Sequence, residues 1–152
     1  MAVRDHHEYL TQKQSHCNCV VCSDKANNPA SLQCKFFADG EGQVVGYYKV
    51  AEQVQGYNQL LHGGVASTLV DAAMTHCLFM QGIQALTAEL NVRFVAPIAV
   101  GDAIKISARL VEQRWGLYQL EASLCVDGKA CVTATAKFLQ PKAGVIGVQP
   151  SL

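Results

Sequence analysis

A single carboxylate lies inside the most apolar stretch of the chain. Asp71 falls in the run from Val65 to Met80, which Gly63-Gly64 precedes and Gly82 follows. Apolar residues spread around most of the helix that this run predicts, which is typical of a buried helix. Asp71 lies too far from the helix start to act as a cap, and burial of a carboxylate is costly unless it is paired or useful. We therefore interpret Asp71 as a catalytic candidate rather than as a solvent-facing or structurally paired side chain.

The polar residues of this predicted helix form one stripe. Ser67, Thr68, Asp71 and Thr75 are spaced at i, i+1, i+4 and i+8, which keeps them on one face of a helix. Polar groups confined to one line of an otherwise apolar helix disfavour a purely structural role for that line.

The N-terminus of the same helix offers a second chemical group. His62-Gly63-Gly64 stands at that end, where adjacent glycines permit close backbone approach and first-turn N–H groups can bind negative charge. This arrangement describes an oxyanion hole, although a Gly-Gly pair can also be only a tight turn. Gly63 and Asp71 are eight residues apart, which is about 12 Å along a helix axis. They cannot reach one carbonyl from the same chain, so they either act separately or belong to a site built between two chains.

The remaining periodicity predicts an antiparallel sheet. Apolar and polar residues alternate in four segments after the helix, and a turn at Asp39-Gly40 separates two candidate strands before it. Asp127-Gly128 predicts a tight type I′ hairpin. In the first strand after the helix, alternation places Ala88 on the buried face and Thr87 on the polar face. The predicted strands are 32–38, 43–50, 87–94, 104–111, 119–126 and 129–138.

These elements define a fold class. Period-two alternation indicates strands that bury one face only, as in antiparallel sheets. The order β-β-α-β-β-β-β predicts an α+β fold of two layers, in which an antiparallel sheet of about six strands covers one long helix.

The composition excludes several classes of protein. The 152 residues fit one domain, and 12 basic and 12 acidic residues give a formal net charge of zero. With half of its residues apolar and 16% charged, the chain is too apolar to be disordered and lacks the cationic excess that holds a nucleic acid. The apolar run around Asp71 is too short and too polar to span a membrane. Low charge with high apolar content suggests further burial against a second copy.

The N-terminal sequence bears on location and on thiol chemistry. Residues 1–10 contain no apolar run, so we expect no secretion signal, a cytoplasmic location and reduced cysteines. His16, Cys17, Cys19 and Cys22 place three thiols and an imidazole within seven residues, a set that zinc could bind tetrahedrally. Cys19-x-x-Cys22 has no second pair at typical spacing, however, since only Cys34 follows. The sequence therefore favours a partly buried knuckle without metal.

A resemblance to a known family covers about residues 17–140. Its most specific part is the run from Gly56 to Asp71, GYNQLLHGGVASTLVD, which resembles the hotdog-fold acyl-CoA thioesterases of the phenylacetate-pathway (PaaI-like) type. The segment Leu90–Phe94, with Pro97 and Gly101-Asp102 after it, fits the same family. We therefore expect a hotdog thioesterase domain over 17–140, a flexible N-terminus over 1–16 and a flexible tail over 141–152.

The resemblance implies an assembly and roles for individual residues. Members form homodimers, often paired into tetramers, with acyl-CoA bound at the dimer interface. Asp71 would act as general base on water or as nucleophile, and the Gly63 N–H of the other subunit would polarise the thioester carbonyl. His62 would shape the turn and contact the thioester, and the Thr87 hydroxyl would help to hold the water. The expected substrate-binding residues are Gly64, Asn58, Ser67, Thr68 and Arg93.

One position departs from the family pattern. Relatives often carry Asn or Gln six residues before the histidine, where this chain has Gly56. Asn58 could replace that group only if the loop bends differently.

Two alternatives compete with hydrolysis. Asp71 and His76 imitate the spacing found in hotdog hydratases, but five residues on a helix leave their side chains about 140° apart, so they cannot converge on one carbon. A non-catalytic acyl-CoA-binding protein on the same scaffold stays open because of Gly56. Thioester hydrolysis needs an oxyanion donor and a base for water, and it requires no metal or redox cofactor.

Overall fold

The computed structural model describes residues 15–146, so most of the two predicted flexible ends lies outside the described residues. The elements in chain order are β1 (Phe36–Ala38), β2 (Gln43–Lys49), the 3-10 helix η1 (Glu52–Val54), α2 (Gly63–Phe79), β3 (Leu86–Phe94), β4 (Ala103–Arg114), β5 (Leu117–Val126) and β6 (Lys129–Leu139). All strands pair antiparallel in one sheet of order β1-β2-β4-β5-β6-β3. The predicted α+β class and element order are confirmed.

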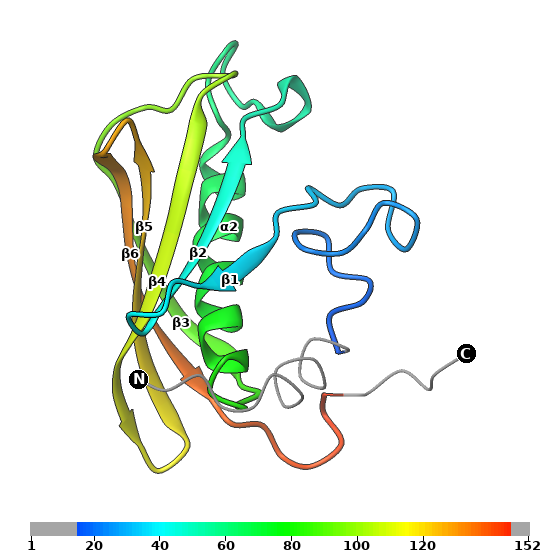
Figure 1. Cartoon of the computed structure of the whole chain (residues 1–152), viewed down its shortest axis with the longest axis vertical. Helices are drawn as coiled ribbons and strands as arrows, with labels where there is room; N and C mark the ends of the chain where they lie inside the picture. The colour runs from blue at the N-terminus through cyan, green and yellow to red at the C-terminus, as the bar shows by residue number, and fades with distance from the viewer. Residues whose placement is uncertain (1–14, 147–152) are drawn as a thin grey trace.

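Helix α2 lies along one face of this sheet (Figure 1). The inward residues of the strands form the core together with the helix, as the period-two alternation requires. The predicted hairpin at Asp127-Gly128 is a tight turn with two consecutive positive φ values, 50° and 79°, and the β4–β5 joint at Trp115-Gly116 has the same pattern, with 48° and 79°. These values are typical of type I′ turns, whose twist matches that of the flanking strands.

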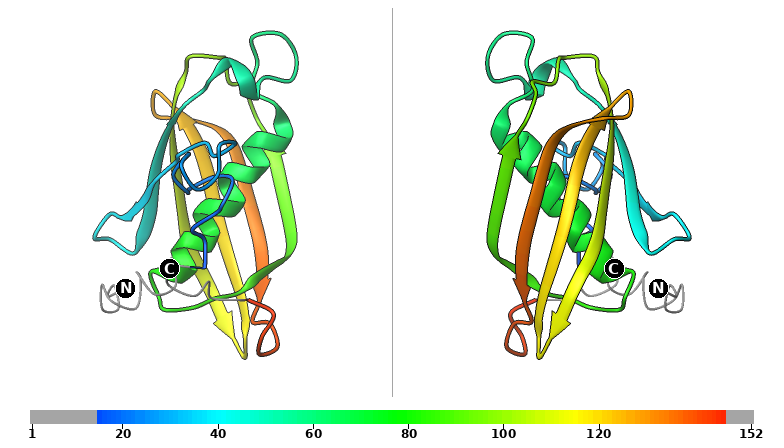
Figure 2. Two further views of the ribbon diagram at one scale, coloured as in Figure 1. Left: turned by 90° about the vertical axis from the view of Figure 1, so that its right-hand side faces the viewer. Right: turned by 90° about the vertical axis from the view of Figure 1, so that its left-hand side faces the viewer.

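Residues 15–35, here called the N-terminal knuckle, pack on the side of α2 that faces away from the sheet (Figure 2, left). Val21 and Cys22 are buried there in the same core cluster as the helix residues. The helix therefore has apolar partners on two sides, which explains why its sequence is apolar nearly all round. None of the helices in the described part of the chain is long and apolar enough to cross a membrane.

The first strand is shorter than predicted. The expected strand 32–38 is reduced to β1, because the backbone N–H groups in its first half bond to residues 20 and 21 rather than to β2. The N–H of Leu32 donates to Val20 O at 2.9 Å, and the N–H of Cys34 donates to Val21 O at 2.9 Å. Apolar alternation alone does not distinguish these two kinds of backbone partner.

Candidate functional site

The carboxylate of Asp71 is held from the edge of the sheet. Thr87 Oγ1 on β3 donates a hydrogen bond of 2.5 Å to Asp71 Oδ1. Asp71 is half-buried, whereas the apolar residues around it on α2 are buried. The structure therefore brings together a helix carboxylate and a strand hydroxyl that are separate in the sequence.

A β-bulge explains how Thr87 reaches the helix. The register of β3 against β6 shifts between Thr87 and Glu89, so Thr87 pairs with the buried Phe138 and shares its face of the sheet. The prediction that Thr87 lies on the polar face was wrong, because strict alternation cannot include the extra residue of a bulge. Bulges commonly redirect one side chain near an active site, and here the redirected side chain contacts Asp71.

The surroundings of Asp71 raise its pKa above the ordinary aspartate value. Burial is the main cause because it disfavours the charged form, and the negative charge of Cys19 acts in the same direction. The hydrogen bond from Thr87 opposes this shift, as does the positive charge of His16. A carboxylate with a raised pKa is a stronger base than an exposed one, which suits abstraction of a proton from water.

Removal of the Thr87 hydroxyl is expected to weaken this base at mildly acidic pH. Thr87→Val keeps the shape of the side chain but removes the hydrogen-bond donor that lowers the pKa of Asp71. The pKa of Asp71 should therefore rise further. The acid limb of kcat/KM then moves to higher pH, with a loss of about 10-fold below neutral pH. A pH–rate profile measures this shift. Thr87→Ser, which retains a hydroxyl, should keep the wild-type profile, and equal profiles for Thr87→Val and wild type would contradict the role assigned to the hydroxyl.

The same pKa shift predicts a gain in stability on neutralisation. Since the pKa of Asp71 is raised in the folded state, its contribution to stability is present below the ordinary aspartate pKa and is lost as the pH rises through the raised value. Asp71→Asn cannot ionise, so it avoids this loss of stability, and its amide oxygen still accepts the hydrogen bond from Thr87. We expect its Tm at pH 7 to exceed that of wild type by about 1–4 °C, with the difference shrinking on acidification. Thermal unfolding at several pH values measures this, and a lower Tm at pH 7 would contradict the burial cost.

The N-terminus of α2 presents one backbone donor. His62 is the N-cap, with φ −63° and ψ 132°, and its Nδ1 accepts the Gly64 N–H at 2.8 Å. The Gly64 N–H is thereby occupied, while the Gly63 N–H has no acceptor among residues 15–146. Gly63 is also exposed. His62 thus caps the helix through the Gly64 N–H, and the exposed Gly63 N–H is the backbone donor at this helix end that a ligand can reach.

A small apolar pocket of about 270 Å³ adjoins this donor. Phe94, at the end of β3, lies against Gly63, and a Cβ added to Gly63 would be 3.4 Å from its ring. The pocket is lined by Leu61, Gly63, Ala66, Phe94, Val95, Ala96, Pro97, Ile98 and Val132. An apolar cavity beside a backbone N–H can receive the carbon chain of a substrate whose carbonyl points at the donor.

Other predicted binding residues lie nearby in different settings. Ser67 Oγ donates to Gly63 O at 3.0 Å and Thr68 Oγ1 donates to Gly64 O at 2.8 Å, so both hydroxyls are bonded within the helix. Asn58 is exposed in the loop before the helix. Gly56 lies close to His62, where a Cβ would approach His62 Cα and Cδ2 to 3.2 Å. A larger residue at Gly56 would press on His62, which would have to give way by a few tenths of an ångström.

Arg93 is not brought to Asp71 within one chain. Arg93 pairs with Thr133 and alternates with the core-facing Val92, so it lies on the sheet face that α2 does not cover, where it lines a groove of about 770 Å³. Figure 2 (right) shows this face of the sheet. Arg109 and Glu121 form an ion pair in the same groove. Asn91, Ser107, Ser123, Thr133 and Thr135 also line it. The single chain therefore offers Arg93 to a ligand or surface on the outer face of the sheet.

Asp71 and His76 point in different directions, as the helical spacing predicts. Asp71 contacts β3, whereas the fully buried His76 ring lies against Phe36 on β1, with ring centroids 4.8 Å apart. This divergence does not fit the convergent acid–base pair of a hydratase. His76 instead meets the N-terminal knuckle, a contact that could not be predicted because no local sequence pattern links the two segments.

The knuckle carries the most perturbed thiol of the described residues. Hydrogen bonds from the Cys22 thiol, from His16 and from the backbone N–H groups of Cys22 and Val21 lower the pKa of Cys19 to about 3, against the opposing effect of burial. By contrast, burial raises the pKa of Cys34 to about 12 and that of Cys77 to about 11. The structure thus separates one activated thiol from buried, inert ones, and none of the seven cysteines, all within residues 15–146, forms a disulfide.

Comparison with known sequences identifies a family segment. Residues 58–114, which include α2 and β3, match the family described as the thioesterase superfamily. Acyl-coenzyme A thioesterase 13 of Mus musculus is 33% identical over 67 residues, which are 43% of this chain and 48% of that protein. Acyl-coenzyme A thioesterase THEM4 of Mus musculus is 28% identical over 108 residues, 69% of this chain and 46% of that protein. The chain spans about half the length of these curated relatives.

Comparison with solved structures establishes the fold. The PaaI protein of E. coli has a TM-score of 0.72 at 18% identity, over 89% of this chain and 99% of that one. Zebra fish thioesterase superfamily member 2 has a TM-score of 0.70 at 22% identity, over 87% of this chain and 96% of that one. A hypothetical thioesterase from Streptococcus pneumoniae TIGR4, solved with coenzyme A, has a TM-score of 0.66 at 20% identity, over 70% and 86%. The predicted hotdog fold is confirmed, since the chain shares its fold with these thioesterase structures and with the E. coli PaaI protein.

Proposed function

We propose that this chain, a hotdog-fold protein that carries a thioesterase-superfamily segment, hydrolyses acyl-CoA thioesters to a free acid and CoA. One observation carries the proposal: the buried helix bears a carboxylate, Asp71, that accepts a hydrogen bond from Thr87 and whose pKa is raised by burial. Similarity to acyl-coenzyme A thioesterases and to a thioesterase solved with coenzyme A supports the substrate class.

The edge strand β3 gives a reason to expect a site made by two copies. In the described part of the chain β3 pairs only with β6, and its other edge has no partner strand. Leu86, Phe94 and Val95 on or beside this edge are between 46% and 57% exposed. An open edge with exposed apolar side chains favours pairing with another strand, and closed homodimers are the commonest way to cover one.

Antiparallel pairing of β3 with itself would complete the site. One end of β3 holds Thr87 beside Asp71, and the other end holds Phe94 beside Gly63. A two-fold axis midway along β3 places Thr87 of one copy opposite Phe94 of the other. Asp71 of one chain then approaches the Gly63 N–H of its partner, although the two are about 12 Å apart along the helix of a single chain. The uncovered outer face of the sheet stays available for pairing of two such dimers.

The chemistry follows from these two groups. Asp71 takes a proton from a water molecule as the water oxygen bonds to the thioester carbon. The carbonyl oxygen becomes negative and accepts a hydrogen bond from the partner's Gly63 N–H, which stabilises the tetrahedral intermediate. The carbon–sulfur bond then breaks, the proton passes from Asp71 to the departing CoA sulfur, and a carboxylic acid is released. The apolar pocket beside Gly63 would hold the acyl chain.

A direct test is release of free CoA thiol from a panel of aliphatic and aryl acyl-CoA esters, together with sedimentation analysis at micromolar protein. We expect turnover of at least one ester and a dimer or larger assembly. Tight acyl-CoA binding without turnover would instead identify a non-catalytic acyl-CoA-binding protein. A monomer at that concentration would contradict the shared site.

A further inference from the structure

Four potential metal ligands converge behind the helix that carries Asp71. The ligand atoms of His16, Cys22 and His76 all lie within 4.8 Å of one another. Cys19 is directly adjacent, because both Cys22 and His16 form side-chain hydrogen bonds with it. Three of these residues come from the N-terminal knuckle, and His76 comes from the last turn of α2.

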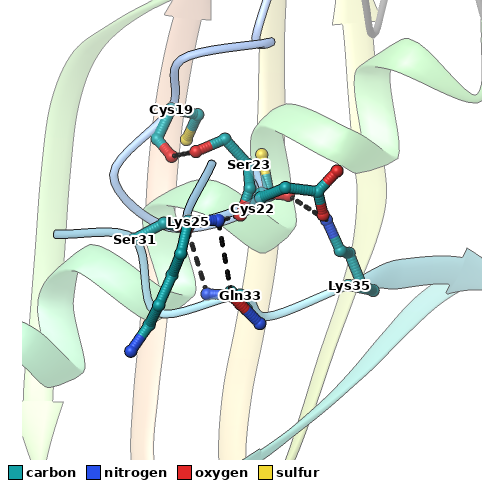
Figure 3. A network of polar contacts seen from close by, with 8 residues as sticks. Cys19, Cys22, Ser23, Lys25, Ser31, Gln33 and Lys35 are labelled. Carbon is teal, nitrogen blue, oxygen red and sulfur yellow. Dashed lines mark hydrogen bonds and ion pairs between the residues drawn. The ribbon is translucent and has the colours of Figure 1, made fainter. Parts of the chain in front are cut away.

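The knuckle is folded so that both thiols face inward. Ser23 N–H donates to Cys19 O at 3.1 Å and Ser23 Oγ donates to the same oxygen at 2.5 Å, which closes a tight turn around the Cys-x-x-Cys pair (Figure 3). The Val21 N–H donates to Cys19 Sγ at 3.3 Å. Lys35 Nζ fixes the turn from outside through Cys22 O at 2.8 Å. A backbone N–H directed at sulfur stabilises a thiolate, which is the form that binds a metal.

The spacing of the cluster suits a tetrahedral ion. Zinc bonds of ordinary length keep sulfur and nitrogen ligands about 3.3–3.8 Å apart. Cys22 Sγ and His16 Nδ1 are 3.7 Å apart. The other two separations within the trio of His16, Cys22 and His76 are at most 4.8 Å, so side-chain rotations can bring these three atoms to the spacing of zinc ligands. Aromatic walls limit these rotations, since the His16 ring lies edge-on to Phe79 with centroids 4.9 Å apart and His76 lies against Phe36.

Charge and burial favour a neutral metal complex at this position. Cys22 is 2% exposed and His76 is fully buried, so polar groups here are expensive unless they have strong partners. Two thiolates and two neutral imidazoles around a divalent ion carry no net charge. Mixed sulfur and nitrogen ligands in tetrahedral geometry select zinc over magnesium, calcium or manganese.

We propose that His16, Cys19, Cys22 and His76 form a structural zinc site that fastens the N-terminal knuckle to helix α2. The site has all four positions filled by protein ligands, which is the closed arrangement of structural zinc. The sequence alone favoured a knuckle without metal because it lacks a second cysteine pair. The helix supplies the missing ligand as His76, which lies far along the chain from the other three. This proposal does not depend on the proposed hydrolysis.

The test measures metal in the full chain and its variants. Protein produced with zinc and purified under reducing conditions should retain about one zinc per chain after gel filtration. His16→Gln and Cys19→Ser change half-buried ligands, so both variants should still fold. Loss of a group that only supports a ligand lowers metal affinity by about 10–100-fold, and loss of a ligand itself should lower zinc affinity by more than that. Cys125→Ser, which removes a thiol on β5 outside the cluster, should retain the metal.

Cobalt replacement gives a readout that a mere change in stability would not produce. Apo protein loaded with Co²⁺ should show the visible bands of a tetrahedral ion and a thiolate-to-cobalt charge-transfer band. That band should weaken to about half in Cys19→Ser and keep its intensity in Cys125→Ser. Folded wild-type protein that retains no zinc and gives no tetrahedral cobalt spectrum would overturn the proposal. Equal metal retention by wild type, His16→Gln and Cys19→Ser would also overturn it.

Discussion

Asp71→Asn is expected to lower kcat for acyl-CoA hydrolysis by about 10²–10⁴-fold, the range that loss of a general base produces. The amide still accepts the Thr87 hydrogen bond, so the geometry around residue 71 is retained. It cannot take a proton from water, and the loss should therefore appear in kcat with little change in KM. Thiol release under saturating substrate measures the effect.

The matched control for this variant is Asp127→Asn. It makes the same charge change at an exposed hairpin position with φ 50°, where asparagine is favoured. Its kcat should equal that of wild type. If Asp71→Asn retained wild-type kcat, Asp71 would not be the base, whatever the effect on stability.

Gly63→Pro is expected to lower kcat by about 10²–10³-fold by deleting one backbone donor. Gly63 is the first residue of α2, a position where proline is tolerated because its nitrogen needs no helical partner. His62 before it is extended, as residues that precede proline prefer. The substitution thus removes an N–H while leaving the helix start in place.

Gly63→Ala separates the loss of the donor from the added volume. Its Cβ would lie 3.4 Å from the Phe94 ring, an ordinary contact, and its N–H remains. We expect near wild-type kcat for Gly63→Ala. Similar losses in the alanine and proline variants would assign the effect to crowding of the apolar pocket and would contradict an oxyanion role for the Gly63 N–H.

Local chemistry made most of the fold predictable. Asp127-Gly128 predicts its type I′ turn because both positions require positive φ, and the structure has them. The run around Asp71 predicts a buried helix because its apolar residues encircle the axis. The structure adds the reason, since the sheet covers one side of α2 and the N-terminal knuckle covers the other.

The remaining features depend on contacts between distant segments. Thr87 reaches Asp71 only because a β-bulge turns its side chain toward α2, and no residue type in β3 predicts that bulge. His76 meets His16 and Cys22 only after the knuckle packs on the helix. In each case the spacing of residues within one segment does not indicate which distant segment it will contact.

The measurement that most directly tests the shared site is activity of a mixed dimer. Asp71→Asn and Gly63→Pro chains, each inactive alone, are coexpressed with different tags, and species carrying both tags are isolated. If each site joins Asp71 of one chain to Gly63 of the other, every mixed dimer has one site with both groups intact, and at least about a quarter of wild-type activity should return. If both groups act within one chain, no site in the mixed dimer is intact. Activity that stays at the level of the single variants, in a dimer shown to contain both chains, would contradict the account.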